Sequence, residues 1–181
     1  MATLQIEVVL PADRDKLGTI TAVSTLTGQP VWGPKFCYGR ADRGTASRHG
    51  NEGAVRTQQY GDTPTGGYQI TGLRPVEPNE MATYGAQDAL KIDGVTGEAM
   101  IRKANGTNDL RIHGGRPTLG ANLLRPTNGC LRLLDIDMQG LLAAIADDGN
   151  GFPIDMTITE GQPPQLVAGG PDDGYDDPMT A

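Results

Sequence analysis

The stretch RIHGGRPTLGANLLRPTNGCLRLLD, residues 111–135, is the most informative part of the chain. A short apolar strand is expected to end at Ile112, and His113 follows it directly. Cys130 comes 17 residues after His113, beyond a loop rich in Gly and Pro that can fold back beside that strand. A thiol needs a neighbouring base or positive charge to react near neutral pH, so this spacing permits a Cys–His pair. The spacing alone is equally compatible with a buried structural Cys and a polar His.

A glycine beside the cysteine favours the catalytic interpretation. Gly129 allows tight backbone geometry in which N–H groups point at an oxyanion, and a buried structural Cys would not need such a neighbour. Arg132 lies on the same side as Cys130 if the chain is extended there. Under this interpretation His113 lowers the pKa of the Cys130 thiol, and replacing His113 should raise that pKa.

Working outward from this stretch, the sequence predicts short strands separated by turns. Leu4, Ile6, Val8 and Leu10 alternate with mostly polar neighbours, which is typical of a half-buried strand. Further strands are expected within 17–28, within 31–39 with Pro34 at an edge or bulge, and at 66–73, 98–102, 110–112 and 154–158.

One helix and several loops complete the pattern. The helix is expected to begin at Asp135 or Asp137 and to end near residues 147–151, with Ile136, Leu141, Leu142 and Ile145 at helical spacing. Residues 40–62 and 114–129 are interpreted as long surface loops, and 74–89 as a loop or broken helix. We therefore predict a mainly β fold, a mixed β-sandwich or barrel-like domain with one or two short helices, over residues 1–160. Residues 161–181 are acidic and poor in apolar side chains, which predicts a disordered tail.

Composition excludes several classes of partner. The 181 residues carry a formal net charge of −7, so a surface that follows nucleic-acid phosphates is not expected. The 15 basic residues can still form one local pocket for a carboxylate. No stretch of 18 apolar residues is present, so membrane insertion is not expected.

Two blocks of sequence resemble the signature of the YkuD-type L,D-transpeptidases. The first is His113-Gly114 followed, after a loop of the family's length, by Thr127-Asn128-Gly129-Cys130-Leu131-Arg132-Leu133. The second is Asp62-Thr63-Pro64-Thr65-Gly66-Gly67-Tyr68-Gln69-Ile70, which is similar to the family's Thr-Pro-x-Gly-x-Phe/Tyr strand. The order of the blocks agrees with the family, and so does a helix, glycine turn and final strand after the cysteine. Asn128 departs from the family, which often has His there, and this puts the detailed reactivity in question.

The resemblance implies an enzyme that acts on peptidoglycan stem peptides without a cofactor or metal. Cys130 would attack the carbonyl at the L-centre of the third residue and expel the terminal D-alanine, with His113 as its base. The Gly114 carbonyl would orient the imidazole. The N–H groups of Cys130, Gly129 and Asn128 would stabilise the oxyanion. Thr127, Gly115 and Arg132 would support the loop or bind substrate. Transpeptidation, L,D-carboxypeptidase activity and D-amino-acid exchange all stay open.

Other classes of protein fit the order and spacing of these residues less well. A sortase-like transpeptidase also uses His, Cys and Arg in that order, but its His lies much further before the Cys and its Arg well after it. Papain-like peptidases place Cys before His. A wall-binding module with a degenerate pocket is the non-enzymatic alternative. Cys37, His49, His113 and Cys130 lack the close ligand pairs of a structural zinc site, so Cys37 is expected to be buried and His49 solvated.

The start of the sequence lacks the pattern of a Sec signal peptide, whereas the implied substrate lies in the periplasm. The expectation is therefore an exported cell-wall toxin effector delivered by a non-Sec route, with a secretion machine or a cognate immunity protein as partner. A cytoplasmic enzyme is the alternative.

Overall fold

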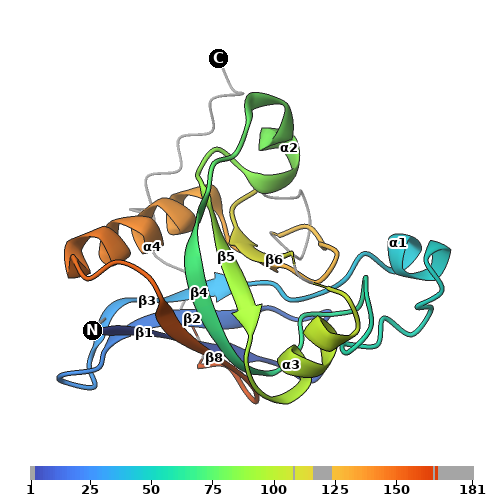
Figure 1. Cartoon of the computed structure of the whole chain (residues 1–181), viewed down its shortest axis with the longest axis horizontal. Coiled ribbons are helices and arrows are strands. Elements are labelled where there is room, and N and C mark those ends of the chain that lie inside the picture. Colours follow the sequence, from blue (N-terminus) through green and yellow to red (C-terminus); the bar gives the residue numbers. More distant parts are fainter. Residues whose placement is uncertain (1–2, 108, 116–123, 165, 167–181) are drawn as a thin grey trace.

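The computed structural model describes residues 3–107, 109–115, 124–164 and 166. Within these residues, eight strands and four α-helices follow one another, and Figure 1 shows their arrangement. The strands are β1 (Leu4–Leu10), β2 (Gly18–Ser24), β3 (Pro30–Cys37), β4 (Gly66–Arg74), β5 (Ala89–Gly94), β6 (Leu110–His113), β7 (Leu131–Arg132) and β8 (Ile154–Glu160). The helices are α1 (Arg43–Arg48), α2 (Met81–Tyr84), α3 (Gly97–Ala104) and α4 (Asp135–Asp148), with a 3-10 turn at Pro78–Glu80 before α2.

All eight strands belong to one sheet in the order β3-β2-β1-β8-β4-β5-β6-β7. The last strand of the sequence, β8, lies in the middle of the sheet, parallel to β1 and antiparallel to β4. Tyr38, just after β3, pairs with Arg132 on β7 through two backbone hydrogen bonds of 2.9 and 3.0 Å. The two ends of the sheet therefore meet, and the sheet curls into a nearly closed barrel.

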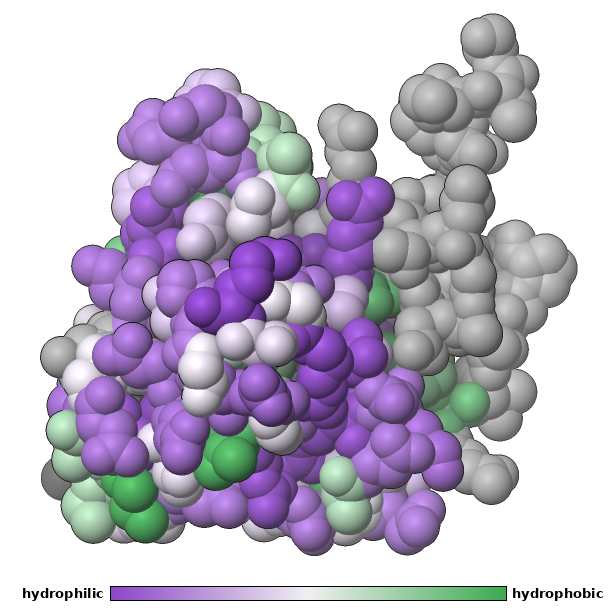
Figure 2. Space-filling model, turned by 90° about the vertical axis from the view of Figure 1, so that its right-hand side faces the viewer, coloured by the Kyte–Doolittle hydropathy of each residue, from purple (hydrophilic) through white to green (hydrophobic). Residues whose placement is uncertain are grey.

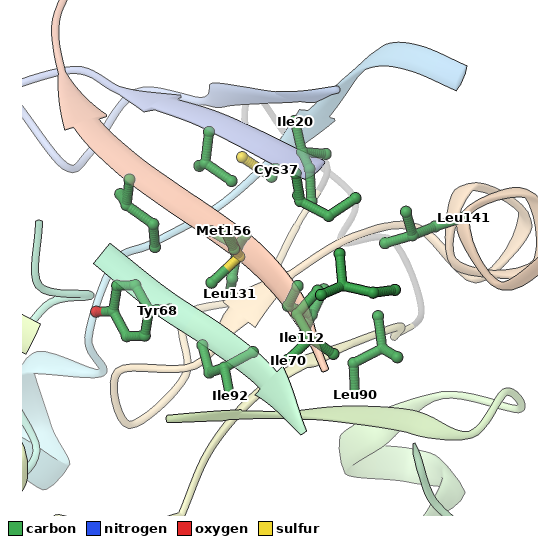
Figure 3. Packing of buried hydrophobic residues seen from close by; sticks show 14 of the residues in the cluster. Ile20, Cys37, Tyr68, Ile70, Leu90, Ile92, Ile112, Leu131, Leu141 and Met156 are labelled. Atoms are coloured by element: carbon green, nitrogen blue, oxygen red, sulfur yellow. The ribbon is translucent and has the colours of Figure 1, made fainter. Parts of the chain in front are cut away.

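The barrel interior is apolar because alternate residues of its strands point inward. Along β1, Leu4, Ile6, Val8 and Leu10 are all at most 4% exposed. Residues of the remaining strands and of α4 pack onto them, among them Ile70, Leu90, Ile112, Leu131, Leu141 and Met156 (Figure 3). This core fixes the position of the short strands β6 and β7, which carry the candidate site.

The prediction of a mainly β, barrel-like fold is confirmed, and the expected edge strand is found in β3. The prediction of a strand at 98–102 is wrong, because these residues lie in α3. Glu98 in the first turn and the cations Arg102 and Lys103 in the last turn suit the helix dipole, and Met100 and Ile101 face solvent. The described residues also hold more short helices than the expected one or two: α1 forms within the segment 40–62 interpreted as a loop, and α2 within 74–89, interpreted as a loop or broken helix.

Other predictions differ in detail or lie outside the described residues. β5 was missed, and α4 begins after Leu134 without a side-chain cap from Asp135 or Asp137. Ile136 is 57% exposed rather than part of the core face. The expected disordered tail over 161–181 lies, except for residues 161–164 and 166, outside the described residues. So does part of the loop at 114–129.

The face of the molecule that carries α1 is mainly hydrophilic, with apolar residues scattered over it (Figure 2). Across the described ranges, none of the helices is long and apolar enough to cross a membrane.

Candidate active site

Strands β6 and β7 set the geometry of the site. They run parallel, with Ile112 beside Leu131 and His113 beside Arg132. Side chains alternate along a strand, and Ile112 and Leu131 both point into the core (Figure 3). The opposite face of the same two strands therefore carries His113 and Arg132. Continued back by one residue, the same alternation places Cys130 on this outer face as well.

The His113 ring is buried and held in one tautomer. Its Nδ1 lies 2.7 Å from the carbonyl oxygen of Gly114, which only accepts hydrogen bonds, so Nδ1 carries the proton. Nε2 is left with a free lone pair. Burial lowers the pKa of His113 to about 3, helped by the positive charge of Arg132. The imidazole is therefore neutral near pH 7, with Nε2 unprotonated.

Cys130 is partly exposed, and its thiol has a raised pKa because burial disfavours the thiolate. The Arg111 backbone N–H donates to the sulfur, and the charges of Arg111 and Arg102 oppose the rise. Among the described residues no hydrogen bond joins Sγ to the His113 ring. This differs from the expectation that His113 lowers the thiol pKa. The site therefore holds a neutral thiol and a neutral imidazole. The positive charges that favour the Cys130 thiolate are those of Arg111 and Arg102.

The cysteine loop, residues 127–130, is held by hydroxyl groups. Thr127 Oγ1 donates to the Cys130 carbonyl at 2.7 Å and accepts from the Gly129 N–H at 3.1 Å. Thr63, which is fully buried, places Oγ1 2.9 Å from the Gly129 carbonyl and 3.2 Å from the Cys130 carbonyl. The second sequence block thus contacts the first. Because its N–H is already used, Gly129 is a poor oxyanion donor, whereas the Cys130 and Asn128 N–H groups have no partner within the described ranges.

Arg102 on α3 also holds the cysteine loop, through a hydrogen bond to the Asn128 carbonyl. Its side chain is completely buried, with Nη1 2.9 Å from both the Gly61 and the Asp62 carbonyls and Nη2 2.8 Å from the Asn128 carbonyl. A Cβ on Gly129 would collide with this guanidinium, and Gly129 has φ 109°. Gly129 is therefore glycine for two reasons, close approach of a buried charge and backbone conformation.

The glycines after His113 make room for other buried charges. A Cβ on Gly114 would collide with Asp135 Oδ1, and one on Gly115 would lie 3.1 Å from the Arg132 guanidinium. Arg132 is 4% exposed and donates through Nη2 to the Thr83 carbonyl of α2. Arg132 therefore supports α2, whereas the roles expected for it were to hold the cysteine loop or to bind a carboxylate of the substrate, and these stay predictions.

Tyr84 at the end of α2 lies over this outer face. Its ring meets the His113 ring edge-on, with centroids 5.0 Å apart. The Arg111 guanidinium lies 5.0 Å from the Tyr84 centroid and that of Arg74 lies 5.4 Å from it. We call Tyr84, Arg74, Arg111, His113 and Arg132 the Tyr84 cluster. The positive charges gathered here suit an anionic ligand.

The structure brings most of the predicted site residues together. His113, Gly114, Gly115, Thr127, Asn128, Gly129, Cys130 and Arg132 all lie on β6, β7 or the connections that flank them. Cys37 is fully buried, as expected, and His49 is exposed and stacks on Tyr60. In the part of the chain that the structure describes, no three His, Cys, Asp or Glu side chains gather as metal ligands would.

Sequence reasoning missed Thr63, Tyr84, Arg102 and Arg111 as residues of the site. Thr63 lies inside the second block that resembles the family, and Arg111 lies two residues before His113 on the same strand face. Their positions in the sequence could therefore have identified Thr63 and Arg111 as residues of the site. Arg102 offered no such signal, because all of its described partners are backbone carbonyls.

No protein-family model and no curated protein sequence matches the chain. Its fold is shared with solved structures, among them Bd1075 from Bdellovibrio bacteriovorus, with a TM-score of 0.55 and 15% identity over 87% of this chain and 48% of that one. The K307A mutant of the helical cell shape determining protein Pgp2 from Campylobacter jejuni gives a TM-score of 0.50 and 15% identity, over 88% of this chain and 48% of that one. The chain thus spans about half the length of these proteins. At this identity the likeness establishes the fold.

Proposed function

We propose that the protein modifies peptidoglycan stem peptides through an acyl-enzyme on Cys130. It would act as an L,D-transpeptidase, with L,D-carboxypeptidase or D-amino-acid exchange activity. The observation that carries the proposal is the tautomer of His113, which leaves Nε2 as a free base on the sheet face that also carries Cys130. The resemblance of both sequence blocks to the YkuD-type enzymes supplies the reaction, and a fold shared with a helical cell shape determining protein fits a wall substrate.

The neutral pair favours concerted proton transfer. As Sγ attacks the carbonyl carbon of the L-configured third residue, Nε2 takes the thiol proton, so that no free thiolate has to form in the buried site. The Cys130 and Asn128 N–H groups are the oxyanion donors of this proposal, which assigns the Gly129 N–H to Thr127 instead. Nε2 then gives its proton to the leaving amine, the C–N bond breaks, and D-alanine leaves behind a thioester.

The fate of the thioester depends on the acceptor. Water gives a tripeptide, a free D-amino acid gives an exchanged tetrapeptide, and a side-chain amine gives a 3-3 crosslink. In each case the acceptor loses a proton to Nε2 and the thiol is restored. Location and delivery partners stay predictions.

The test is mass spectrometry of disaccharide tetrapeptides after incubation with the protein, with and without an added D-amino acid. Wild type should release D-alanine or exchange it, and Cys130→Ala should lower turnover by at least ~10³-fold. Cys37→Ala is the matched control, because Cys37 is fully buried and its side chain belongs to the barrel core. Loss of turnover in both variants, with both folded, would argue against Cys130 as the nucleophile. Unchanged tetrapeptide in every sample would favour a binding module.

A further inference from the structure

Arg111 is a buried cation beside the candidate nucleophile to which the mechanism above gives no role. It precedes His113 by two residues on β6, so both side chains project from the outer face of the strand. Its backbone N–H donates to the Cys130 sulfur, and its guanidinium lies on the Tyr84 ring, 5.0 Å from the centroid. Tyr84 in turn meets the His113 ring. Arg111 is therefore next to both the thiol and the base.

The hydrogen-bonding capacity of Arg111 is only partly used. Its side chain is 8% exposed, and Nη1 is buried with no hydrogen-bond partner among the described residues. A buried charged donor without a partner is destabilising, so such a group is rarely left unpaired without a reason. A planar guanidinium that is held against a ring and has a free nitrogen is suited to bind a carboxylate.

The existing partner of Arg111 is one that a ligand can displace. Nε donates to Asp109 Oδ1 at 3.0 Å, and Nη2 donates to the same carboxylate. The Asp109 side chain is 74% exposed, and an ion pair with so much solvent access contributes little to stability. Asp109 therefore shows that a carboxylate fits the Arg111 guanidinium, while binding it weakly.

The neighbouring arginines are less available. Arg132 donates to the Thr83 carbonyl, and Arg74 is held by both carboxylate oxygens of Glu80, at 2.6 and 2.7 Å. Arg102 is committed to backbone carbonyls. Among the described guanidinium groups around the thiol and Tyr84, Arg111 is the one that combines a free nitrogen with an exposed, exchangeable partner.

The proposed reaction indicates which carboxylate would bind there. The His113 ring must deliver a proton to the amine of the leaving residue. In a terminal D-amino acid the carboxylate is one carbon beyond that amine, so it must lie near the base. Arg111 is the available cation in that place, since Tyr84 contacts both Arg111 and His113.

We propose that Arg111 binds the α-carboxylate of the D-amino acid that leaves, and thereby selects stem peptides that end at that residue. This inference rests on the proposed function. It makes the enzyme specific for the chain terminus: a peptide that continues beyond the fourth residue, or that ends in a carboxamide, lacks the anion that Arg111 binds.

The test compares two matched substrates, a tetrapeptide with a free terminal carboxylate and the same peptide as its carboxamide. Wild type should prefer the free acid, by the ratio of kcat/KM, by about 10–100-fold, the value of one or two charge-assisted hydrogen bonds. Arg111→Gln should bring this ratio close to one, chiefly through a higher KM for the free acid, and Arg111→Lys should restore part of it.

Asp109→Asn separates this role from a structural ion pair. If Arg111 serves the substrate, Asp109→Asn keeps the preference for the free acid and lowers KM, because a competing carboxylate is gone. If Asp109→Asn reproduces Arg111→Gln, or if Arg111→Gln slows both substrates equally, the inference is overturned. Wild type that turns over both substrates equally also overturns it but leaves the proposed function standing. Wild type that turns over neither substrate removes both.

Discussion

The cysteine loop and the Tyr84 cluster lie on the same side of strands β6 and β7 but are held in opposite ways. The loop is held by buried donors that reach backbone carbonyls, from Thr63, Thr127 and Arg102. In the Tyr84 cluster, by contrast, the buried atoms Arg111 Nη1 and Arg132 Nε have no hydrogen-bond partner within the described residues. The candidate nucleophile is therefore fixed before any ligand binds, while the surface beside it keeps unused hydrogen-bonding capacity for a ligand.

The largest effect should come from the cation beneath the cysteine loop. Arg102→Met removes every hydrogen bond from the buried guanidinium to the carbonyls of Arg56, Gly61, Asp62 and Asn128 and leaves those acceptors unsatisfied. The free energy of unfolding should fall by about 3–5 kcal/mol, as measured by urea denaturation.

The matched control is Arg111→Met in the Tyr84 cluster. Its pair with Asp109 is exposed on the carboxylate side, so the loss should be below about 1 kcal/mol. Equal losses in the two variants would break the contrast between a fixed loop and a cluster with spare capacity.

A smaller effect, one that depends on pH, should come from the Tyr84 cluster. The pKa of His113 is about 3 in the folded chain, whereas an unfolded histidine titrates near ~6.5. Between these values the unfolded chain binds a proton that the folded chain does not, so acidification favours unfolding. Wild type should lose about 2 kcal/mol more stability than His113→Gln between about pH 7 and about pH 5.

His49→Gln provides the comparison, because His49 is exposed and lies outside the cluster. It should follow the wild-type curve. If His113→Gln declines with acid as steeply as wild type, the imidazole is not held neutral by burial, and the neutral thiol–imidazole pair has to be abandoned.

The smallest effect should come from a single hydroxyl group at the cysteine loop. Thr63→Val removes the contact of Oγ1 with the Gly129 and Cys130 carbonyls and should cost about 1 kcal/mol. It should also change the rate at which iodoacetamide alkylates Cys130, because the loop loses one of its supports.

Thr65→Val, two residues further along, tests whether this effect is local. Thr65 donates its hydroxyl to Glu98 at 2.8 Å and does not contact the cysteine loop. Its loss of stability should be similar, with the alkylation rate unchanged. An equal change of rate in both variants would mean that the reactivity follows global stability rather than the geometry of the loop.

What the sequence predicted depended on local signals. Alternation revealed β1 and β8, and the motifs around His113 and Cys130 lie close enough in sequence for their spacing to be informative. The bonds of Arg102 were beyond such reasoning, because its acceptors include main-chain oxygens 26 and 40 residues away, and no side-chain pattern marks a carbonyl. β5 could have been predicted, since Leu90 and Ile92 alternate with polar residues. The segment is too short for this alternation to stand out.

The pKa shifts of His113, which is lowered, and of Cys130, which is raised, could not be predicted either. Sequence proximity suggested that the imidazole acts as the base for the thiol and lowers its pKa. The tertiary structure buries the ring next to Arg132, and a second positive charge there is unfavourable. The sign of this effect depends on which face of β6 and β7 is covered by α2, which is a long-range property.

The central place of β8 has a consequence for synthesis. A ribosome makes β8 after β1 to β7, yet β8 joins β1–β3 to β4–β7 in the middle of the sheet, opposite the bridge between Tyr38 and Arg132. Until residues 154–160 emerge, the bridge from Tyr38 to Arg132 must form without the strand that aligns the two halves. Contacts this distant in sequence form slowly, since the loop they close carries a high entropic cost. The nascent chain is therefore expected to lack activity until residues 154–160 have been synthesised, because Cys130 is not yet held in position.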